Sequence, residues 1–458
     1  MFLETIHRLF LGPAVLAGLF LVGGYFCFRL RLFWLFHPHK TTKTLFLGEQ
    51  PKSVFVAVCL ALAGTMGVGN ITGVALALIT GGPGAIFWML LSAFFAMAVK
   101  YAEVTLAMDS RKRVGTGWQG GAPFYMKGKG KGGHILPLIF SILCVACAVF
   151  QGSVIQGNAA ALSLSHITHL SPVFCGASLT ILTLIIFFLG RHKIPTITAL
   201  LIPCATGLYL VMCLAVIFTH ASSIPSVIRT IFDSAFTPKA GVGGVLGFLL
   251  SDGARIGCAR GLLSNEAGCG TAPLAHITAE GTTPARQGIW GIFEVTLDTV
   301  VVCTLTAFAC LCALPTATGD VHLYITEVFA SVFGTFSPFL VGVVIVFFAF
   351  STTLTWAFYG LSCLGKSPCL RVLYLILYAL CVTIGAACST EMAFSMTDVL
   401  LGIMTLINLV ILLKKADRVV TLSAKEGLLS VNQTCGYAPA PGHPRSQDDQ
   451  GHPQTPAR

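Results

Sequence analysis

Eleven long apolar stretches follow one another along the chain, separated by short polar segments. Each is long enough to cross about 30 Å of hydrocarbon at about 1.5 Å per residue. Their hydrophobicity is continuous, without the strict alternation of a β-barrel, and a backbone in lipid must satisfy its own hydrogen bonds. The pattern therefore predicts an all-α polytopic membrane protein with helices at about 10–28, 54–80, 84–108, 135–162, 172–189, 197–219, 243–263, 288–313, 333–360, 371–389 and 395–413.

The first stretch is predicted to be a retained helix and not a cleaved signal peptide. Its apolar run is too long, no small-residue cleavage site follows it, and Arg29 and Arg31 come directly after it. The mature chain is therefore expected to span the membrane eleven times.

Composition narrows the class of protein further. Only 10% of the 458 residues are charged and 55% are hydrophobic, whereas soluble proteins are about 25% charged. This argues against a soluble enzyme, a nucleic-acid binder and a disordered scaffold. The net charge of +10 comes from short, scattered clusters of Lys and Arg, so the expected partner is the lipid bilayer and not nucleic acid. No obligatory protein partner and no cofactor are predicted.

The distribution of Lys and Arg predicts the orientation. With the N-terminus outside, 25 of the 28 basic residues fall in inside segments, among them Arg255, Arg260 and Arg286, and only Arg8, Arg229 and Lys239 remain outside. The positive-inside rule then predicts a multi-pass protein of the plasma (inner) membrane with a cytoplasmic C-terminus. Residues 414–458 turn polar and rich in Pro, Gly, His and Gln, which predicts a disordered cytoplasmic tail.

The second stretch carries an unusual density of glycines in mid-membrane. Residues 64–73 read GTMGVGNITG, with Asn70 among four glycines. Close helix packing is one interpretation, but it explains neither Asn70 nor the number of glycines. We expect an unwound helix, whose free N–H groups favour a carboxylate and whose free carbonyls favour a cation.

The seventh stretch is expected to contain a second break. Residues 249–270 place Gly253, Gly257 and Gly261 beside Asp252, Arg255 and Arg260; the alternative is a helix that ends near Leu250 and continues as a cytoplasmic loop. Breaks in the first and sixth of ten helices are what an inverted repeat of five plus five produces. The predicted organisation is an N-terminal helix and linker at 1–53, repeats at 54–219 and 243–413, an outer loop at 220–242 and the tail at 414–458.

Several long motifs resemble those of the alanine or glycine:cation symporter family (sodium:alanine symporters). They are GVGNITGVALALITGGPGAIFWM (67–89), KYAEVTLAM (100–108), GGAPFYM (120–126), RGLLSNEAGCGTAPLAH (260–276), LDTVVVCTLTA (297–307) and FSTTLTWAFYG (350–360). The chain departs from the family pattern at Ala122, Phe124, Met126, Cys269 and Thr271. The resemblance implies a leucine-transporter-type core with one extra N-terminal helix, which agrees with the predicted topology.

The resemblance also implies a substrate site at the first break. The backbone of Val68, Gly69 and Ile71 is expected to meet the substrate carboxylate, followed by Thr72 and Gly73, while Asn70 is shared between substrate and cation or, alternatively, bonds between helices. Further expected pocket residues, each equally compatible with plain helix packing, are Phe150, Gln156, Asn158 and Trp356. Gln151 lies in the same polar stretch as these amides.

The resemblance places sodium between the carbonyls of Ala63 and Met66, Asn70 and the hydroxyls of Ser351, Thr352 and Thr353. In the absence of a buried carboxylate, carbonyls and hydroxyls must supply the oxygens that this hard cation needs. For each hydroxyl the alternative is a bond to its own i−4 carbonyl.

Other polar side chains within the spans suggest gating or proton transfer. Arg260, Asn265 and Glu266 are predicted to form a cytoplasmic-side gate. Glu294 and Asp298, at i and i+4, are expected to pair with a Lys or Arg of another span or, alternatively, to carry a coupling proton. Cys144 and Cys147 lie in an apolar helix without a second pair, so no metal or redox role is expected.

The predicted function is therefore a sodium-coupled importer of alanine or glycine by alternating access, and not an enzyme. The chain contains no GxxxxGK[ST] nucleotide-binding loop, so a gradient must supply the energy. The alternative within transport is a proton-coupled carrier of alanine, D-alanine, glycine or serine. A channel would need a symmetric filter and an intramembrane enzyme a nucleophile with its base or a metal cluster, and the sequence indicates neither.

Overall fold

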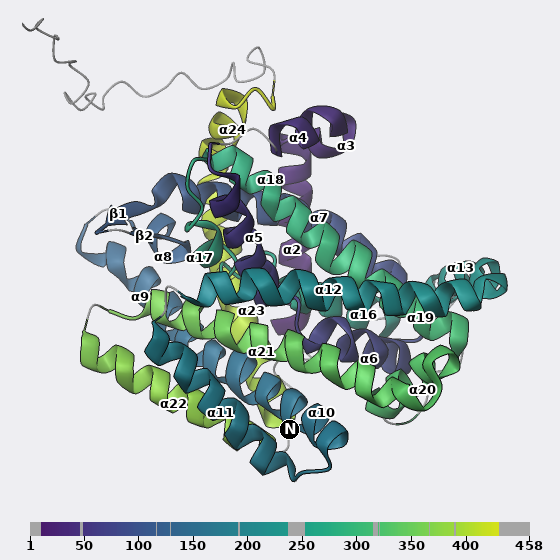
Figure 1. Cartoon of the computed structure of the whole chain (residues 1–458). Helices are drawn as coiled ribbons and strands as arrows, with labels where there is room; N and C mark the ends of the chain where they lie inside the picture. Colours follow the sequence, from purple (N-terminus) through teal and green to yellow (C-terminus); the bar gives the residue numbers. More distant parts are fainter. Residues whose placement is uncertain are drawn as a thin grey trace, which may run out of the picture.

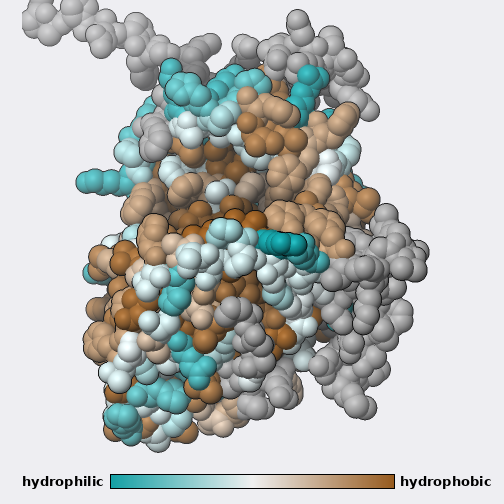
Figure 2. All heavy atoms as spheres, turned by 90° about the vertical axis from the view of Figure 1, so that its right-hand side faces the viewer, coloured by the Kyte–Doolittle hydropathy of each residue, from teal (hydrophilic) through white to brown (hydrophobic). Residues whose placement is uncertain are grey.

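The computed structural model describes residues 11–45, 49–115, 117–128, 130–190, 193–236, 252–314, 319, 321–365, 367–388 and 391–429. Each of the eleven predicted spans corresponds to a helix or an interrupted helix within these residues, although the seventh is described only from Asp252. Apolar side chains cover much of the surface, for example Phe28 at 82% and Phe188 at 79% exposed, as expected for helices that face lipid. Figure 2 shows this hydrophobic surface across the middle of the molecule.

The first half of the core follows the extra helix α2 (Gly12–Arg29). Proline in the first turn and a side-chain cap help to start these helices; the Ser171 hydroxyl, for example, accepts from the amide of Phe174 at the start of α11. In chain order the elements are α5 (Pro51–Thr65), the short turn η2 (Val68–Asn70), α6 (Thr72–Gly81), α7 (Ala85–Ser110), α9 (Ile135–Cys147), the π-helical η4 (Ala148–Ile155), α10 (Gln156–Thr168), α11 (Pro172–Leu189) and α12 (Ile194–Thr219).

The second half repeats this order of broken and continuous helices. Its elements are α16 (Asp252–Asn265), α17 (Pro273–His276), α18 (Pro284–Val295), the π-helical η7 (Thr296–Cys303), α19 (Thr304–Ala313), α21 (Ser337–Cys363), α22 (Pro368–Ala387) and α23 (Glu391–Lys414).

Equivalent helices of the two halves pack against each other. Counted from each broken helix, the second helices pair as α7 with α18, the third as α10 with α21, and the fourth as α11 with α22. A two-fold axis produces this arrangement, because it brings an element against its own copy. The packing therefore supports the predicted inverted repeat, which the sequence indicated only through the breaks and the helix count.

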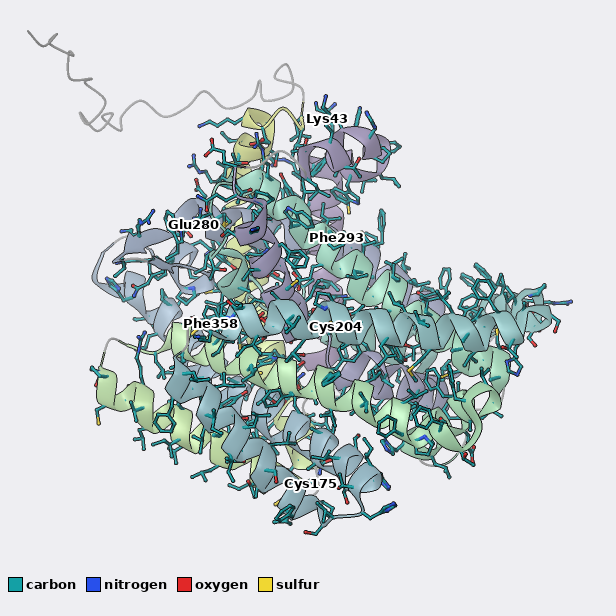
Figure 3. All side chains as sticks on the ribbon, viewed as in Figure 1. Lys43, Cys175, Cys204, Glu280, Phe293 and Phe358 are labelled. Carbon is teal, nitrogen blue, oxygen red and sulfur yellow. The ribbon has the colours of Figure 1, made fainter. Side chains whose placement is uncertain are left out.

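Shorter elements gather at the two ends of the bundle (Figure 1). One end, the α13 end, carries α13 (Ile224–Ala235) and α20 (Val321–Phe333). The other, the α24 end, carries the β1–β2 hairpin (Lys112–Val114 with Gly117–Gln119), α3 (Phe33–Phe36), α4 (Pro38–Leu45), α8 (Ala122–Tyr125) and α24 (Ala416–Lys425). Lys43 and Glu280 lie toward this second end in Figure 3, whereas Cys175 lies on the far side of the molecule.

The structure changes the expected extent of two polar segments. The segment 220–242 contains the amphipathic helix α13, and its residues 237–242 lie outside the described residues, as do 243–251 of the seventh span and 430–458 of the tail. Within the segment predicted to be a disordered tail, Ala416–Lys425 form a helix that docks on the bundle: the Arg418 guanidinium donates to both Asp109 carboxylate oxygens, at 2.6 and 2.8 Å.

The second break lies farther along the chain than predicted. Residues 253–261 are helical, and their glycines allow close packing on α7: a Cβ at Gly257 would lie 2.1 Å from the Ala85 carbonyl oxygen. The helix ends only after Asn265, where Glu266 adopts a left-handed φ of 52°. The break therefore lies between α16 and α17.

This packing also places Arg255 and Arg260 nearer to the other end of the bundle than the sequence analysis predicted. Gly253 lies against Gly81 and Gly257 against Ala85, so α16 runs parallel to α7 with its N-terminal half at the α13 end. Arg255 and Arg260 therefore lie toward the α13 end of the bundle and Arg111 toward the opposite end, whereas the sequence analysis assigned all three to the same side.

Candidate functional site

The interrupted helix α5–η2–α6 leaves backbone groups free at its centre. Gly67 N–H bonds to the Thr65 carbonyl at 3.0 Å and to Asn70 Oδ1 at 3.2 Å, and so not to the Ala63 carbonyl. Asn70 N–H bonds to the Gly67 carbonyl, which frees the carbonyl of Met66. Among the described residues, the N–H groups of Val68 and Gly69 make no hydrogen bond. One interruption thus presents both carbonyls and N–H groups, as the sequence predicted.

The free carbonyl of Met66 meets a hydroxyl from another span. Thr352 Oγ1 on α21 donates to it at 3.3 Å, and Trp356 Nε1, one turn further along α21, donates to the Gly64 carbonyl at 3.3 Å. The adjacent hydroxyls bond within their own helix, Ser351 to the Phe348 carbonyl and Thr353 to that of Ala349. The structure therefore brings the Thr352 hydroxyl to the break, whereas the Ser351 and Thr353 hydroxyls match the alternative of bonds within their own helix.

An amide oxygen without a partner lies beside the same break. Gln156 on α10 is 2% exposed, and its Oε1 has no hydrogen bond among the described residues. A Cβ at Gly67 would lie 3.3 Å from Gln156 Oε1 and 3.1 Å from Thr352 Oγ1, so these oxygens face the same stretch of backbone. A buried acceptor without a donor is costly unless a ligand, ion or water satisfies it.

Asn70 connects the first broken helix to the second. Its Nδ2 lies 2.8 Å from Asp298 Oδ1 on η7 and 3.2 Å from Ser264 Oγ at the end of α16, and its carbonyl accepts from Thr306 on α19. Asp298 Oδ2 also accepts from Ser264 at 2.7 Å and from Thr299 at 2.8 Å. A buried carboxylate therefore lies beside Asn70, one member of the expected ion site, where the sequence analysis expected carbonyls and hydroxyls alone.

The other predicted carboxylate belongs to a buried ionic cluster nearer the α24 end. Lys100 Nζ on α7 lies 3.3 Å from Glu294 Oε1 and 3.7 Å from Glu103 Oε1, and all three side chains are fully buried. His276 Nε2 on α17 lies 2.9 Å from Glu294 Oε2. Glu103 Oε2 accepts from the amides of Gly270 and, on α23, Asn408. Glu294 thus pairs with a lysine of another span as predicted, whereas Asp298 bonds to the uncharged side chains of Asn70, Ser264 and Thr299.

The predicted gate residues do not assemble at a cytoplasmic surface. Asn265 and Glu266 are buried at the level of Asn70; Asn265 Nδ2 donates to Thr299 at 3.2 Å, and Glu266 Oε2 accepts from Thr271 at 2.7 Å. Arg260 makes no ion pair with Glu266 in the described part of the chain. These contacts tie the second break together, and a role in gating stays a prediction.

Two predicted pocket residues are not brought to the break by a described contact. Asn158 donates to the carbonyls of Gly385 at 2.9 Å and Cys388 at 3.3 Å, which matches the alternative of helix packing on α22. Phe150 lies half-buried on η4, near Gly152, where the chain passes so close to Trp356 that a Cβ would lie 2.1 Å from the Cβ of Trp356. Ile71 is buried, and a Cβ at Gly69 or Gly73 would have no atom within 4 Å, so these two glycines border open space.

Sequence reasoning missed Ser264, Thr306 and the cluster around Lys100. Serine and threonine in apolar helices carry no distinguishing signal, because they also bond to their own carbonyls. Lys100 and Glu103 did carry one, since two charges at i and i+3 inside a predicted span require partners.

Comparison with known proteins identifies the family of the chain and its fold. The family model "Sodium:alanine symporter family" matches residues 1–425. The chain is 34% identical over 435 residues to the sodium/alanine symporter AgcS of Methanococcus maripaludis, covering 91% of this chain and 95% of the relative. It is 30% identical over 398 residues to the probable sodium/glutamine symporter GlnT of Bacillus subtilis, covering 85% and 82%.

A solved structure of a manganese transporter mutant from Eremococcus coleocola has the same arrangement of helices. It superposes with a TM-score of 0.54 at 12% identity, over 80% of this chain and 78% of that one, a likeness that concerns the fold alone. The predicted leucine-transporter-type architecture is confirmed. The match over nearly the whole chain, together with the broken helix at Asn70, shows that this multi-pass membrane protein belongs to the sodium:alanine symporter family.

Proposed function

We propose that the protein imports a small neutral amino acid, alanine or glycine, together with sodium, by alternating access around the two broken helices. In this proposal the α13 end faces outward and the α24 end faces the cytoplasm. The observation that carries it is the meeting of the freed Met66 carbonyl, the Thr352 hydroxyl and the unpartnered Gln156 oxygen at one helix break. A backbone carbonyl, a hydroxyl and a side-chain amide supply the oxygen ligands that a hard cation requires.

The proposed sodium site uses the carbonyls of Ala63 and Met66 and the hydroxyl of Thr352. When the cation binds, Thr352 changes from donating to Met66 to offering its lone pairs to the ion. Asn70 Oδ1 and the carboxylate of Asp298, which lie within the same hydrogen-bonded group, hold the break in shape. Ser351 and Thr353 complete the site only if their hydroxyls break their hydrogen bonds to the carbonyls of Phe348 and Ala349.

The proposed substrate site lies against the free N–H groups of Val68 and Gly69. These groups meet the carboxylate, because a helix N-terminus favours negative charge. Ile71, Thr72 and Gly73 follow at the start of α6, while Gln156 accepts from the ammonium group and Trp356, which donates to the Gly64 carbonyl, forms the wall on that side. The open space at Gly69 and Gly73 leaves room for a small side chain.

The test is uptake of labelled alanine and glycine into proteoliposomes under an inward sodium gradient, with potassium as the control. Thr352→Val removes the hydroxyl at nearly constant volume and is expected to raise the sodium concentration for half-maximal uptake at least about tenfold, as loss of a hydrogen bond or ligand of about 1.5 kcal/mol would. Thr353→Val is the matched control and is expected to change it less than about twofold. Equal effects in the two variants would contradict the assignment of Thr352.

A proton-coupled carrier of alanine, D-alanine, glycine or serine is the second candidate, and the buried carboxylate of Asp298 beside Asn70 favours it. Uptake that is equal in sodium and potassium but driven by an imposed proton gradient would select this candidate. Competition with D-alanine, serine and glutamine in the same vesicles measures the substrate range.

A further inference from the structure

A cavity of about 350 Å³ lies between four helices, toward the α13 end of the bundle from the break at Asn70. Its walls come from α2, α6, α16 and α23, and they are largely apolar: Leu16, Leu76 and Leu401 line it from three of these helices. Leu76 lies six residues after Asn70, or about 9 Å along the axis of α6. An apolar space of this size inside a membrane protein suits part of a hydrocarbon chain.

The ionisable side chains on these walls carry one net positive charge. Among the described residues they are Arg255 and Arg260 on α16 and Asp398 on α23. Arg255 and Asp398 each have an interaction within the protein, whereas the half-buried Arg260 makes no hydrogen bond or ion pair in the part of the chain that the structure describes. A charge inside a span is costly unless water or an opposite charge meets it. The cavity therefore favours an anion at Arg260.

The level of Arg260 in the membrane suits a phosphate group at the edge of the hydrocarbon. Arg260 lies five residues before Asn265, which ends α16 at the level of Asn70, and so about 7.5 Å toward the α13 end. The hydrocarbon ends about 15 Å from its middle, and an arginine side chain in this position extends its charged end toward the membrane surface. A guanidinium group binds phosphate through two parallel hydrogen bonds.

We propose that this cavity binds an anionic phospholipid, whose phosphate pairs with Arg260 and whose acyl chain lies in part against the apolar walls from α2, α6 and α23. A headgroup with a net negative charge is preferred, because a zwitterionic headgroup already supplies a cation to its own phosphate. The proposal does not depend on the transported substrate. It gives the extra helix α2 a role, since α2 forms one wall, and the bound lipid contacts one half of each broken helix, α6 and α16.

The experiment is saturable binding of tritiated dioleoylphosphatidylglycerol to the purified full-length protein, in non-ionic detergent with excess phosphatidylcholine. Arg260→Gln is expected to raise the concentration for half-maximal binding at least about tenfold, and Arg260→Lys at least about threefold, because an ammonium group lacks the two parallel hydrogen bonds. Ala259→Phe fills the cavity without a change of charge and is expected to weaken binding as much as Arg260→Gln. The matched control, Arg229→Gln, removes an exposed arginine of α13 and is expected to change binding less than about twofold.

The remaining outcomes overturn the proposal in distinguishable ways. Equal binding by the wild type and Arg260→Gln would remove the site, and equal weakening by Arg229→Gln would indicate a general effect of charge. Displacement of the labelled lipid by inorganic phosphate or chloride at constant ionic strength, with Ala259→Phe binding as the wild type, would show that Arg260 takes a free anion instead of a lipid. Melting curves in the same detergent confirm that each variant is folded, and Arg260→Lys with Ala259→Phe decide if Arg260→Gln is not.

Discussion

Removing Lys100 should strongly destabilise the protein, because its ammonium group is the cation between two buried carboxylates. At an effective dielectric constant of about 20, contacts of 3.3 Å to Glu294 and 3.7 Å to Glu103 are each worth about 4 to 5 kcal/mol before desolvation. Desolvation of three buried ions offsets much of this energy. The net cost of removing one partner of a buried ion pair is about 3 to 5 kcal/mol.

We expect Lys100→Met to lie near the lower end of that range. The Glu294 carboxylate keeps His276 at 2.9 Å, and the Glu103 carboxylate keeps the amides of Gly270 and Asn408. The double variant Lys100→Met with Glu294→Gln leaves one fewer unpaired charge and should recover about half of the loss, since neutral groups of similar volume often replace a buried pair at little cost.

The assay is unfolding by denaturant in mixed detergent micelles, with the free energy extrapolated to zero denaturant for wild type, both single variants and the double variant. This completes a double-mutant cycle, which isolates the coupling between the two side chains. A loss below about 1 kcal/mol for Lys100→Met, or a double variant no more stable than Lys100→Met alone, would refute this reasoning.

Three further predictions follow from the contacts. Asp298→Asn should lower alanine uptake at least about tenfold, because the carboxylate accepts from Asn70, Ser264 and Thr299 and hydrogen bonds to a charged group are worth about 1.5 to 3 kcal/mol; a pH profile of uptake that stays as in the wild type would argue against a proton role for Asp298. Gly257→Ala should lower the melting temperature, since its Cβ would lie 2.1 Å from the Ala85 carbonyl oxygen, whereas Gly73→Ala, with no atom within 4 Å, should not; equal melting temperatures would contradict the packing of α16 on α7. Arg418→Ala should cost less than about 1 kcal/mol because the pair with Asp109 is partly exposed, whereas truncation after Lys415 should cost measurably more; the denaturant midpoints of the two variants decide.

The sequence predicted the helices well and the second break poorly, for physical reasons. A helix that crosses lipid must be long and apolar, so the hydrophobicity of the sequence predicts the spans directly. The helix α11, for example, begins and ends at the predicted residues. Glycine has two uses in such helices, unwinding and close packing. At Gly67 and Gly69 it accompanies a break, whereas at Gly257 and Gly261 it allows contact with α7, and only the neighbouring helix distinguishes the two.

The sequence also predicted which residues gather at the first break but not the contacts that several of them make. Asn70, Met66, Thr352 and Gln156 come together because they lie at or face one backbone interruption. The direction of each hydroxyl could not be predicted, since Ser351, Thr352 and Thr353 differ only in which helix face they occupy. The partners of Asn70 come from α16 and η7, about two hundred residues away in sequence, and no local pattern reports such contacts.

The contacts of α24 make it a suitable place for a label that reports movement of the helices. Asp417 contacts Arg29 of α2, Arg418 contacts Asp109 in the last turn of α7, and Glu426 contacts Thr283 and Arg286 at the start of α18. The C-terminal helix is thereby fastened to the paired helices α7 and α18 and to the extra helix α2 at once. A fluorophore or spin label attached just after Leu429 would travel with these three helices, and its distance to a second label on α22 would follow the transport cycle without a probe inside the membrane.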